Sequence, residues 1–226
     1  MTDSEAYERF QKSTKIGYDE WHDGTGYDLD AFAQMTTGEK DRVARDLLVR
    51  GNLDWRDMEV LRLHGNSESV EKLRDLLATG SMDQRAHALR ELIEMGKMSG
   101  NVPDAQLAHV LDDIDGLAGM TTALTIAAQH AGALSNAALL RGIRDRRAVA
   151  VNFAGMVCYL AGVTDEEFDW NLRPLFLRLG EGTPEGDRNA AFAELCKLVG
   201  VPPQQIPEQG RGVGVEFPKS KRGRKA

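Results

Sequence analysis

The chain has 226 residues, of which 42% are hydrophobic, and a formal net charge of -7. This hydrophobic share is enough to bury a substantial core, either as one domain or as one continuous array. Residues 211–226 carry six basic side chains against one acidic, a balance of +5, which leaves -12 on the 210 residues before them. Because an acidic body repels phosphates, we expect no nucleic-acid partner except through the basic tail, Lys219–Lys225.

The cysteines and the apolar stretches indicate a compartment. Only Cys158 and Cys196 occur, which is too few for a disulfide framework and fits a reducing cytoplasm. The first ten residues are polar and charged and lack the apolar stretch of a secretory signal. The longest apolar stretches, 117–128 and 148–162, are too short or too interrupted to span a membrane. We therefore expect a cytoplasmic protein that does not contact the membrane.

Residues 1–35 differ in composition from the rest of the chain. They hold eight acidic residues against three basic ones, and Gly17, Gly24 and Gly26 interrupt regular structure. Their aromatic side chains are Tyr7, Phe10, Tyr18, Trp21, Tyr27 and Phe32. We interpret residues 1–35 as an aromatic and acidic N-terminal cap segment.

From residue 36 to residue 200 the sequence predicts one helix after another. Apolar residues recur at helical spacing, capping residues precede them and glycines follow them, as Asp54 and Gly65 do around the segment 55–64. The predicted helices cover 38–50, 55–64, the stretch between Ser67 and Gly80, 82–95, 103–113, 118–131, 135–145, 147–161, 165–179 and 185–199. No segment shows a sustained strand-type alternation, so the predicted fold class is all-α.

The glycines that close these segments are regularly spaced. Gly96, Gly132, Gly162 and Gly200 lie 36, 30 and 38 residues apart. Four and eight positions before them stand only apolar residues: Leu92, Ala128, Cys158 and Cys196, then Ala88, Leu124, Ala154 and Phe192. A period of about 30–40 residues built from helix pairs is typical of a helical solenoid, in which stacked units bury one another's apolar faces.

Two segments carry a resemblance to a family. Residues 84–96 (QRAHALRELIEMG) and 188–200 (RNAAFAELCKLVG) resemble the second helix of HEAT-type repeats, with small residues early and leucines late. The resemblance covers residues 36–200 and implies a right-handed α-α superhelix of about four to five helix pairs. Residues 16–28 (IGYDEWHDGTGYD) resemble leader segments of bacterial HEAT-like proteins of uncharacterised function. The middle repeats lack the usual proline and the Asp/Arg pair between helices, so the repeat count stays open.

Two further expectations concern the interior and the end of the chain. The segments 116–131 and 148–162 are apolar on nearly all sides, and we expect them to form the central pair of helices. Residues 201–226 contain three prolines and the basic run, and we expect a linker and a disordered end.

The first candidate site lies in residues 16–30. Its candidate partner-binding residues are Asp19, Glu20, Trp21, His22, Asp23, Tyr27 and Asp28. Aromatic side chains supply anchor area and carboxylates favour a basic partner, so this segment suits protein recognition. The alternative is that its aromatic residues only seal the exposed end of the first repeat. The spacing of its carboxylates and histidine matches no defined metal loop, so we predict neither a metal nor a cofactor.

The second candidate site is a basic cluster around residues 141–147. Arg141, Arg144, Arg146 and Arg147 could hold an anion or an acidic patch of a partner. The alternative is a solvated edge that pairs with nearby acids. Cys158 and Cys196 occupy positions where other repeats have leucine or alanine, so we predict that both are core residues and not nucleophiles.

These observations favour a protein that binds another protein and does not catalyse a reaction. One version is an immunity-type protein that neutralises a toxin, in which an acidic face complements a basic nuclease. The alternatives come from resemblance of fold: a nucleic-acid-directed enzyme of the helical-repeat DNA glycosylase type, or a chromophore lyase-like protein. The sequence leaves open the partner, the face that binds it and the oligomeric state.

Overall fold

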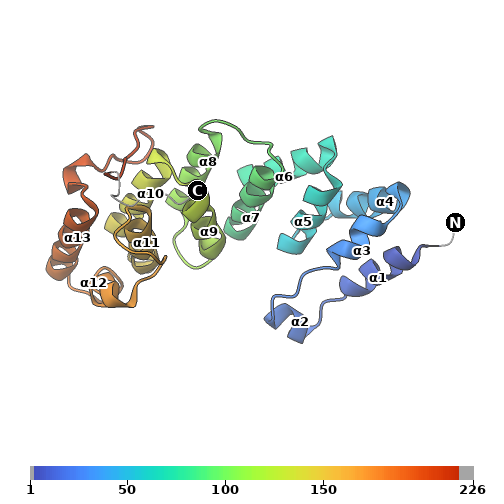
Figure 1. Ribbon diagram of the computed structural model, residues 1–226, viewed down its shortest axis with the longest axis horizontal. Helices are drawn as coiled ribbons and strands as arrows, with labels where there is room; N and C mark the ends of the chain where they lie inside the picture. Colours follow the sequence, from blue (N-terminus) through green and yellow to red (C-terminus); the bar gives the residue numbers. More distant parts are fainter. Residues whose placement is uncertain (1–2, 219–226) are drawn as a thin grey trace. The chain divides into compact units, whose positions relative to one another are not determined.

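The computed structural model describes residues 3–218, with only the backbone of Trp21. All regular secondary structure in that range is helical, which confirms the predicted all-α class. The chain divides into two compact units, Met1–Lys97 and Met98–Ala226, called unit 1 and unit 2 below. Figure 1 labels the helices of both units.

Unit 1 contains two stacked helical hairpins preceded by shorter helices. Its helices are α1 (Glu5–Ser13), α2 (Tyr18–His22), α3 (Leu29–Gln34), α4 (Thr37–Leu48), α5 (Trp55–His64), α6 (Ser67–Thr79) and α7 (Met82–Glu94). In the stack, α4 lies against α6 and α5 lies against α7. Leu61, Leu73 and Leu89 are fully buried between these helices, and burial of such side chains is the main stabilising contribution.

Local capping residues determine where these helices begin. Thr36 and Glu39 form a reciprocal capping box at the start of α4. The carboxylate of Asp54 accepts hydrogen bonds from the backbone amides of Arg56 and Asp57 at the start of α5. Gly65 ends α5 with a φ of 70°, a left-handed conformation that favours glycine. The sequence therefore predicts the bounds of these helices to within a residue or two.

The N-terminal segment forms a small aromatic core of its own. α1 packs against α3, and the ring of Phe10 contacts the rings of Phe32 at 5.6 Å and Tyr27 at 5.8 Å between centroids. Gly17 and Gly24 lie between the short helices, where the sequence predicts interruptions.

Unit 2 also begins with two stacked hairpins. Its elements are α8 (Val102–Asp113), α9 (Met120–His130), α10 (Ala133–Asp145), α11 (Arg147–Leu160), η1 (Trp170–Leu172), α12 (Arg173–Leu177), α13 (Glu185–Val199) and η2 (Pro203–Gln205). α8 lies against α10 and α9 against α11, while α11 also contacts α12 and α13.

The central pair of unit 2 is α10 with α11, and not α9 with α11 as the apolar pattern predicts. Nine of the thirteen residues of α10 are buried, among them Ser135, Asn136 and Arg141. In α9, by contrast, Thr121 and Thr125 are exposed. The prediction is wrong because α10 buries polar side chains that have partners in the fold, which an apolar pattern cannot reveal.

The helix predicted over 165–179 is limited to η1 and α12, and residues 163–169 are irregular. The chain crosses α11 at Gly155, where a Cβ atom would lie 2.7 Å from the carbonyl oxygen of Glu167. The hydroxyl of Thr164 donates a hydrogen bond to the carbonyl of Glu166 at 2.9 Å, in competition with helical bonding. Pro174 stands in the first turn of α12, where a helix has no partner for the N–H that proline lacks.

The structure also corrects the prediction of a linker and a disordered end for residues 201–218. Val201, Ile206 and Val215 are buried, and the backbone N–H of Val215 donates a hydrogen bond to the carbonyl of Ala133 at 2.7 Å. Prolines and glycines separate these apolar residues, so no periodicity signals their burial. The basic run Lys219–Lys225 lies outside the described residues.

Candidate functional site

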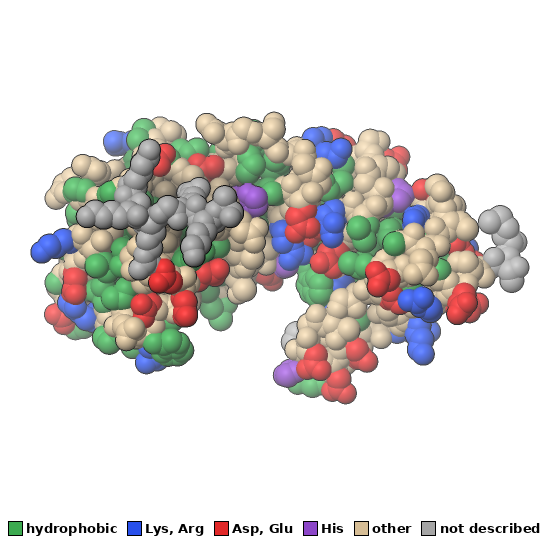
Figure 2. All heavy atoms as spheres, in the orientation of Figure 1, with side chains coloured by type: hydrophobic (Ala, Val, Ile, Leu, Met, Phe, Trp, Pro, Cys, Tyr) green, Lys and Arg blue, Asp and Glu red, His purple; other side chains and the backbone are tan. Residues whose placement is uncertain are grey.

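The predicted N-terminal site presents acidic side chains on α2. Asp19, Glu20 and Asp23, called the acidic segment below, are exposed, and so is His22. Figure 2 shows acidic side chains gathered over α2. The Glu20 carboxylate accepts the backbone N–H of Gly17 at 3.0 Å, and Nδ1 of His22 lies 3.1 Å from Oδ1 of Asp23. Trp21 lies in α2, and its side chain is outside the described part of the chain.

Tyr27 and Asp28, predicted as binding residues, have structural roles. The hydroxyl of Tyr27 donates a hydrogen bond to Oδ1 of Asp57 on α5 at 3.1 Å, and burial followed by the charge of Asp57 raises the pKa of Tyr27. The carboxylate of Asp28 accepts the N–H of Ala31 at 2.8 Å and pairs with Arg9 at 2.8 Å, so that the pKa of Asp28 is lowered. These contacts fix the loop that follows the acidic segment.

A cavity of about 350 Å³ lies at the first turns of α5 and α7 in unit 1. Its lining residues are Asn52, Leu53, Asp54, Trp55, Met58, Ser81, Asp83, Gln84 and His87. Gln84 holds the two sides together, because its side-chain amide donates to the carbonyl of Leu53 at 3.0 Å. Burial lowers the pKa of His87 to about 4, which keeps its imidazole neutral at pH 7.

The loop after α2 connects the acidic segment to this cavity. The guanidinium Nε of Arg56 donates to the carbonyl of Thr25 at 2.6 Å, and Cζ of Arg56 lies 4.7 Å from the ring centroid of Trp55. A Cβ atom at Gly26 would lie 3.5 Å from the same ring, which is ordinary contact. The side chain of Trp55 therefore contacts this loop and also lines the cavity. The sequence gives Asp54 and Ser81 as helix caps, but nothing in it indicates that the two caps line one cavity.

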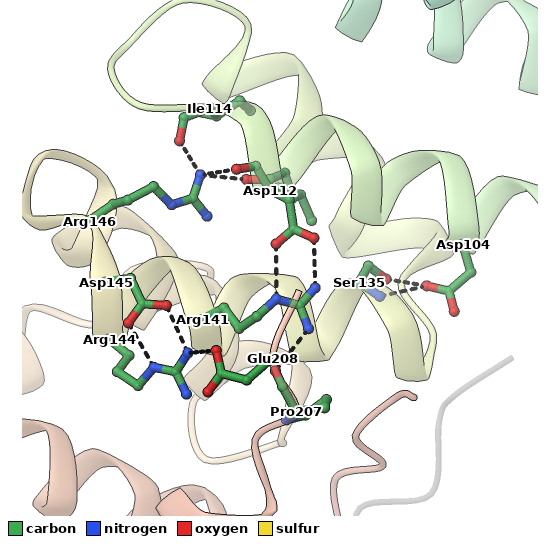
Figure 3. A network of polar contacts seen from close by, with 11 residues as sticks. Asp104, Asp112, Ile114, Ser135, Arg141, Arg144, Asp145, Arg146, Pro207 and Glu208 are labelled. Carbon is green, nitrogen blue, oxygen red and sulfur yellow. Dashed lines mark hydrogen bonds and ion pairs between the residues drawn. The ribbon is translucent and has the colours of Figure 1, made fainter. Parts of the chain in front are cut away.

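The predicted arginine cluster has intramolecular partners throughout. Arg141 makes a bidentate pair with Asp112 at 3.1 and 2.7 Å, and both side chains are more than nine-tenths buried. Arg144 pairs with Asp145 and Glu208, and Arg147 with Glu185 and the carbonyl of Thr183. Figure 3 shows the pairs of Arg141 and Arg144. These contacts favour the alternative in which the arginines pair with nearby acids.

Arg146 has a different role, at the end of α8. Its guanidinium donates to the carbonyls of Leu111 at 2.9 Å and Asp112 at 2.8 Å, and also to that of Ile114 (Figure 3). These are carbonyls that the end of a helix leaves without a partner. Asp104 caps the start of α10 in a similar way, because its carboxylate accepts hydrogen bonds from the backbone N–H groups of Gly132, Leu134 and Ser135. Charged side chains in this part of unit 2 therefore connect one hairpin to the next.

Both cysteines are core residues, as predicted. Cys158 and Cys196 are buried, and burial raises their pKa values to about 12 and about 11. A thiol with such a pKa is protonated near pH 7 and therefore a poor nucleophile. Within residues 3–218 no group of three or more His, Cys, Asp or Glu side chains is arranged to hold a metal ion.

No family model, no curated protein and no solved structure matches the chain. Among the described helices, none combines the length and the apolar character needed to cross a bilayer.

Proposed function

We propose that the chain binds a protein partner without catalysing a reaction, and that the partner presents a basic surface to the acidic segment. The single observation that carries the proposal is an exposed set of carboxylates, Asp19, Glu20 and Asp23, in and just after α2. The loop that follows them contacts Arg56 and Trp55 beside the cavity. The proposal extends to a HEAT-like solenoid in the cytoplasm of a bacterium. In its most specific form the protein is an immunity-type protein that neutralises a basic toxin.

The two parts of the site suit different tasks in binding. Exposed charge pairs contribute only about 0–1 kcal/mol each, so the acidic segment acts mainly on the association rate and on the choice of partner. A cavity lined by Trp55, Leu53 and Met58 can take one side chain of a partner, and a buried anchor of that kind contributes most of the affinity. Asp54 and Asp83 line the same cavity, so a side chain with an apolar stem and a positive end suits it.

The packing of the hairpins supports the solenoid part of the proposal. In each unit the first helix of one hairpin lies against the first helix of the next, and the second helices pair likewise. Repeat arrays are built from such nearest-neighbour contacts. Of the four residues that stand four positions before the spaced glycines, Leu92, Cys158 and Cys196 are buried and Ala128 is half-buried.

The experiment compares two triple variants of equal charge. In the test variant Asp19→Asn, Glu20→Gln and Asp23→Asn neutralise the acidic segment. In the control Asp46→Asn, Glu68→Gln and Asp75→Asn neutralise three other exposed acids of unit 1. A partner is first captured from a lysate with the wild-type chain and then purified, and its association rate is measured against all three proteins in low and moderate salt.

We expect the test variant to associate roughly tenfold more slowly at low salt, and the difference to shrink as salt increases. The control should keep a rate within about twofold of the wild type. Equal rates for test variant and control would refute the assignment of the site. Failure to capture any stoichiometric protein partner would count against the binding function itself.

A further inference from the structure

Residues 206–218, called the strap below, contact α10 in unit 2, with Val215 at the start of the helix and Pro207 and Glu208 nearer its end. The N–H of Val215 donates to the carbonyl of Ala133 at 2.7 Å, and the Nδ2 amide of Asn136 donates to the carbonyl of Val215 at 3.1 Å. α10 therefore binds both main-chain groups of one strap residue. Recognition through the main chain does not depend on the identity of the side chain.

The side chains of the strap fit α10 at alternate positions. Val215 is 6% exposed, whereas Val213, two residues earlier, is 56% exposed. Gly214 approaches so closely that a Cβ atom there would overlap Cβ of Ala133 and lie 2.6 Å from its carbonyl carbon. In the strap sequence Gly-Val-Gly-Val, Gly214 has no side chain at the point where the strap backbone meets that of α10. The next residue, Val215, places a branched apolar side chain in the buried position beside it.

Two arginines hold the earlier part of the strap. Nη1 of Arg141 donates to the carbonyl of Pro207 at 3.3 Å, and Nη2 of Arg144 lies 3.1 Å from a carboxylate oxygen of Glu208 (Figure 3). Arg141 also pairs with Asp112, and this ion pair does not depend on the strap. The hydrogen bond from Arg141 to the strap is therefore an additional contact of a side chain that is already fixed in position.

One buried polar atom beside the strap has no hydrogen-bond partner among the described residues. Asn136 is more than nine-tenths buried, and its Oδ1 has no hydrogen-bond partner among the described residues. A buried acceptor without a donor costs free energy that a bound N–H would recover. The strap therefore accepts a hydrogen bond from the Nδ2 donor of Asn136 but provides no donor for its Oδ1 acceptor.

We propose that the strap is a ligand bound in cis, and that its seat on α10 (Ala133, Asn136 and Arg141) binds an extended segment of the protein partner in its place. The partner segment carries glycine at the position of Gly214 and a branched apolar residue at that of Val215, and it donates an N–H to Oδ1 of Asn136. Beyond the Val215 position it has room, because Glu216 borders a cavity of about 410 Å³ that Asp104 and His130 also line. Only the existence of the partner rests on the function proposed above.

The test uses the full-length chain and a fluorescent peptide with the sequence of residues 209–218, QGRGVGVEFP. The strap competes with this peptide for its seat, so the apparent dissociation constant equals the intrinsic one divided by the fraction of chains with an open seat. Val215→Ala removes buried methyl groups from the strap and opens the seat. Val213→Ala is the matched control, because the same substitution is made at an exposed residue of the same segment.

We expect Val215→Ala to bind the peptide at least about tenfold more tightly than the wild type, and Val213→Ala to stay within about twofold of it. Asn136→Asp keeps an acceptor at this position but removes the donor to the carbonyl of the bound segment. Combined with Val215→Ala, it should weaken peptide binding by about tenfold relative to Val215→Ala alone. A peptide with valine at the position of Gly214 should not bind any of the chains. Because only the peptide is changed in this measurement, the folding of the protein cannot affect the result.

Equal peptide affinity of wild type and Val215→Ala, or binding of the valine-containing peptide, would overturn the proposal. Circular dichroism and a cooperative thermal transition establish that each variant is folded. The acidic segment is not used in any arm, so the outcome is independent of the basic-partner experiment.

Discussion

Two charge-rich regions illustrate when charge in a sequence is available for binding. In and just after α2 the carboxylates of the acidic segment are exposed, and among the described residues their hydrogen-bond partners are the sequence neighbours Gly17 and His22. Around the start of α11, Arg141 and Arg147 reach Asp112 and Glu185, which lie 29 and 38 residues away along the chain. The first region leaves its charge exposed to solvent, whereas the second uses its charge to connect hairpins. Both regions are rich in charged residues. They differ in how far along the chain the partners of those residues lie.

The largest effect is expected where a buried pair is broken. Arg141→Met leaves the carboxylate of Asp112 buried without its bidentate partner, and we expect the free energy of unfolding to fall by about 3–5 kcal/mol. Arg178→Met removes an exposed pair with Glu194 and should cost no more than about 1 kcal/mol. Urea denaturation gives both values. Similar losses for the two variants would mean that burial does not distinguish the arginines.

A smaller effect is expected at the anchor of the acidic segment. Tyr27→Phe removes one hydrogen bond to a buried carboxylate, and we expect the free energy of unfolding to fall by about 1–1.5 kcal/mol. Tyr18→Phe is the matched control, because Tyr18 is 74% exposed and should change it by less than about 0.5 kcal/mol. Thermal and urea unfolding measure the difference, and an unchanged Tyr27→Phe protein would show that the loop is not anchored through this contact.

The cavity in unit 1 should make stability depend on pH through His87. Its folded pKa of about 4 lies below the unfolded value of about 6.5, so the unfolded chain binds more protons between these values. The contribution of His87 is therefore fully present above pH 6.5 and is lost as the pH falls toward 4. Unfolding free energies measured from pH 7.5 to pH 4 should decrease less for His87→Gln than for the wild type. Parallel curves would contradict a half-buried, neutral His87.

The smallest effect is expected where the charges are exposed to solvent. Neutralising Asp19, Glu20 and Asp23 together should change the free energy of unfolding by less than about 0.5 kcal/mol, since exposed charges contribute little to stability. Urea denaturation at low salt is the measurement. A loss comparable to that of Arg141→Met would place these carboxylates in the fold and remove the contrast between the two regions.

Helix positions could be predicted from the sequence because their signals are local. Thr36 with Glu39, and Asp54 with Asp57, start helices through contacts three residues apart, and Gly65 ends one through its own backbone conformation. The burial of Cys158 followed from the apolar positions before the spaced glycines. The helix predicted over 165–179 failed because the close approach of Glu167 to Gly155 is a tertiary contact.

By itself the sequence determined the all-α class, most helix bounds from residue 36 on and the core position of the cysteines. The class and the helix bounds depend on residues within a few positions of one another, where side-chain spacing and backbone geometry suffice. The cysteines were assigned to the core from the apolar positions that recur before the spaced glycines. Only the tertiary structure decided which arginines have partners, that Trp55 and His87 line one cavity, and that residues 206–218 lie on α10. Those features need groups that are tens of residues apart to meet, and the packing of helices brings them together.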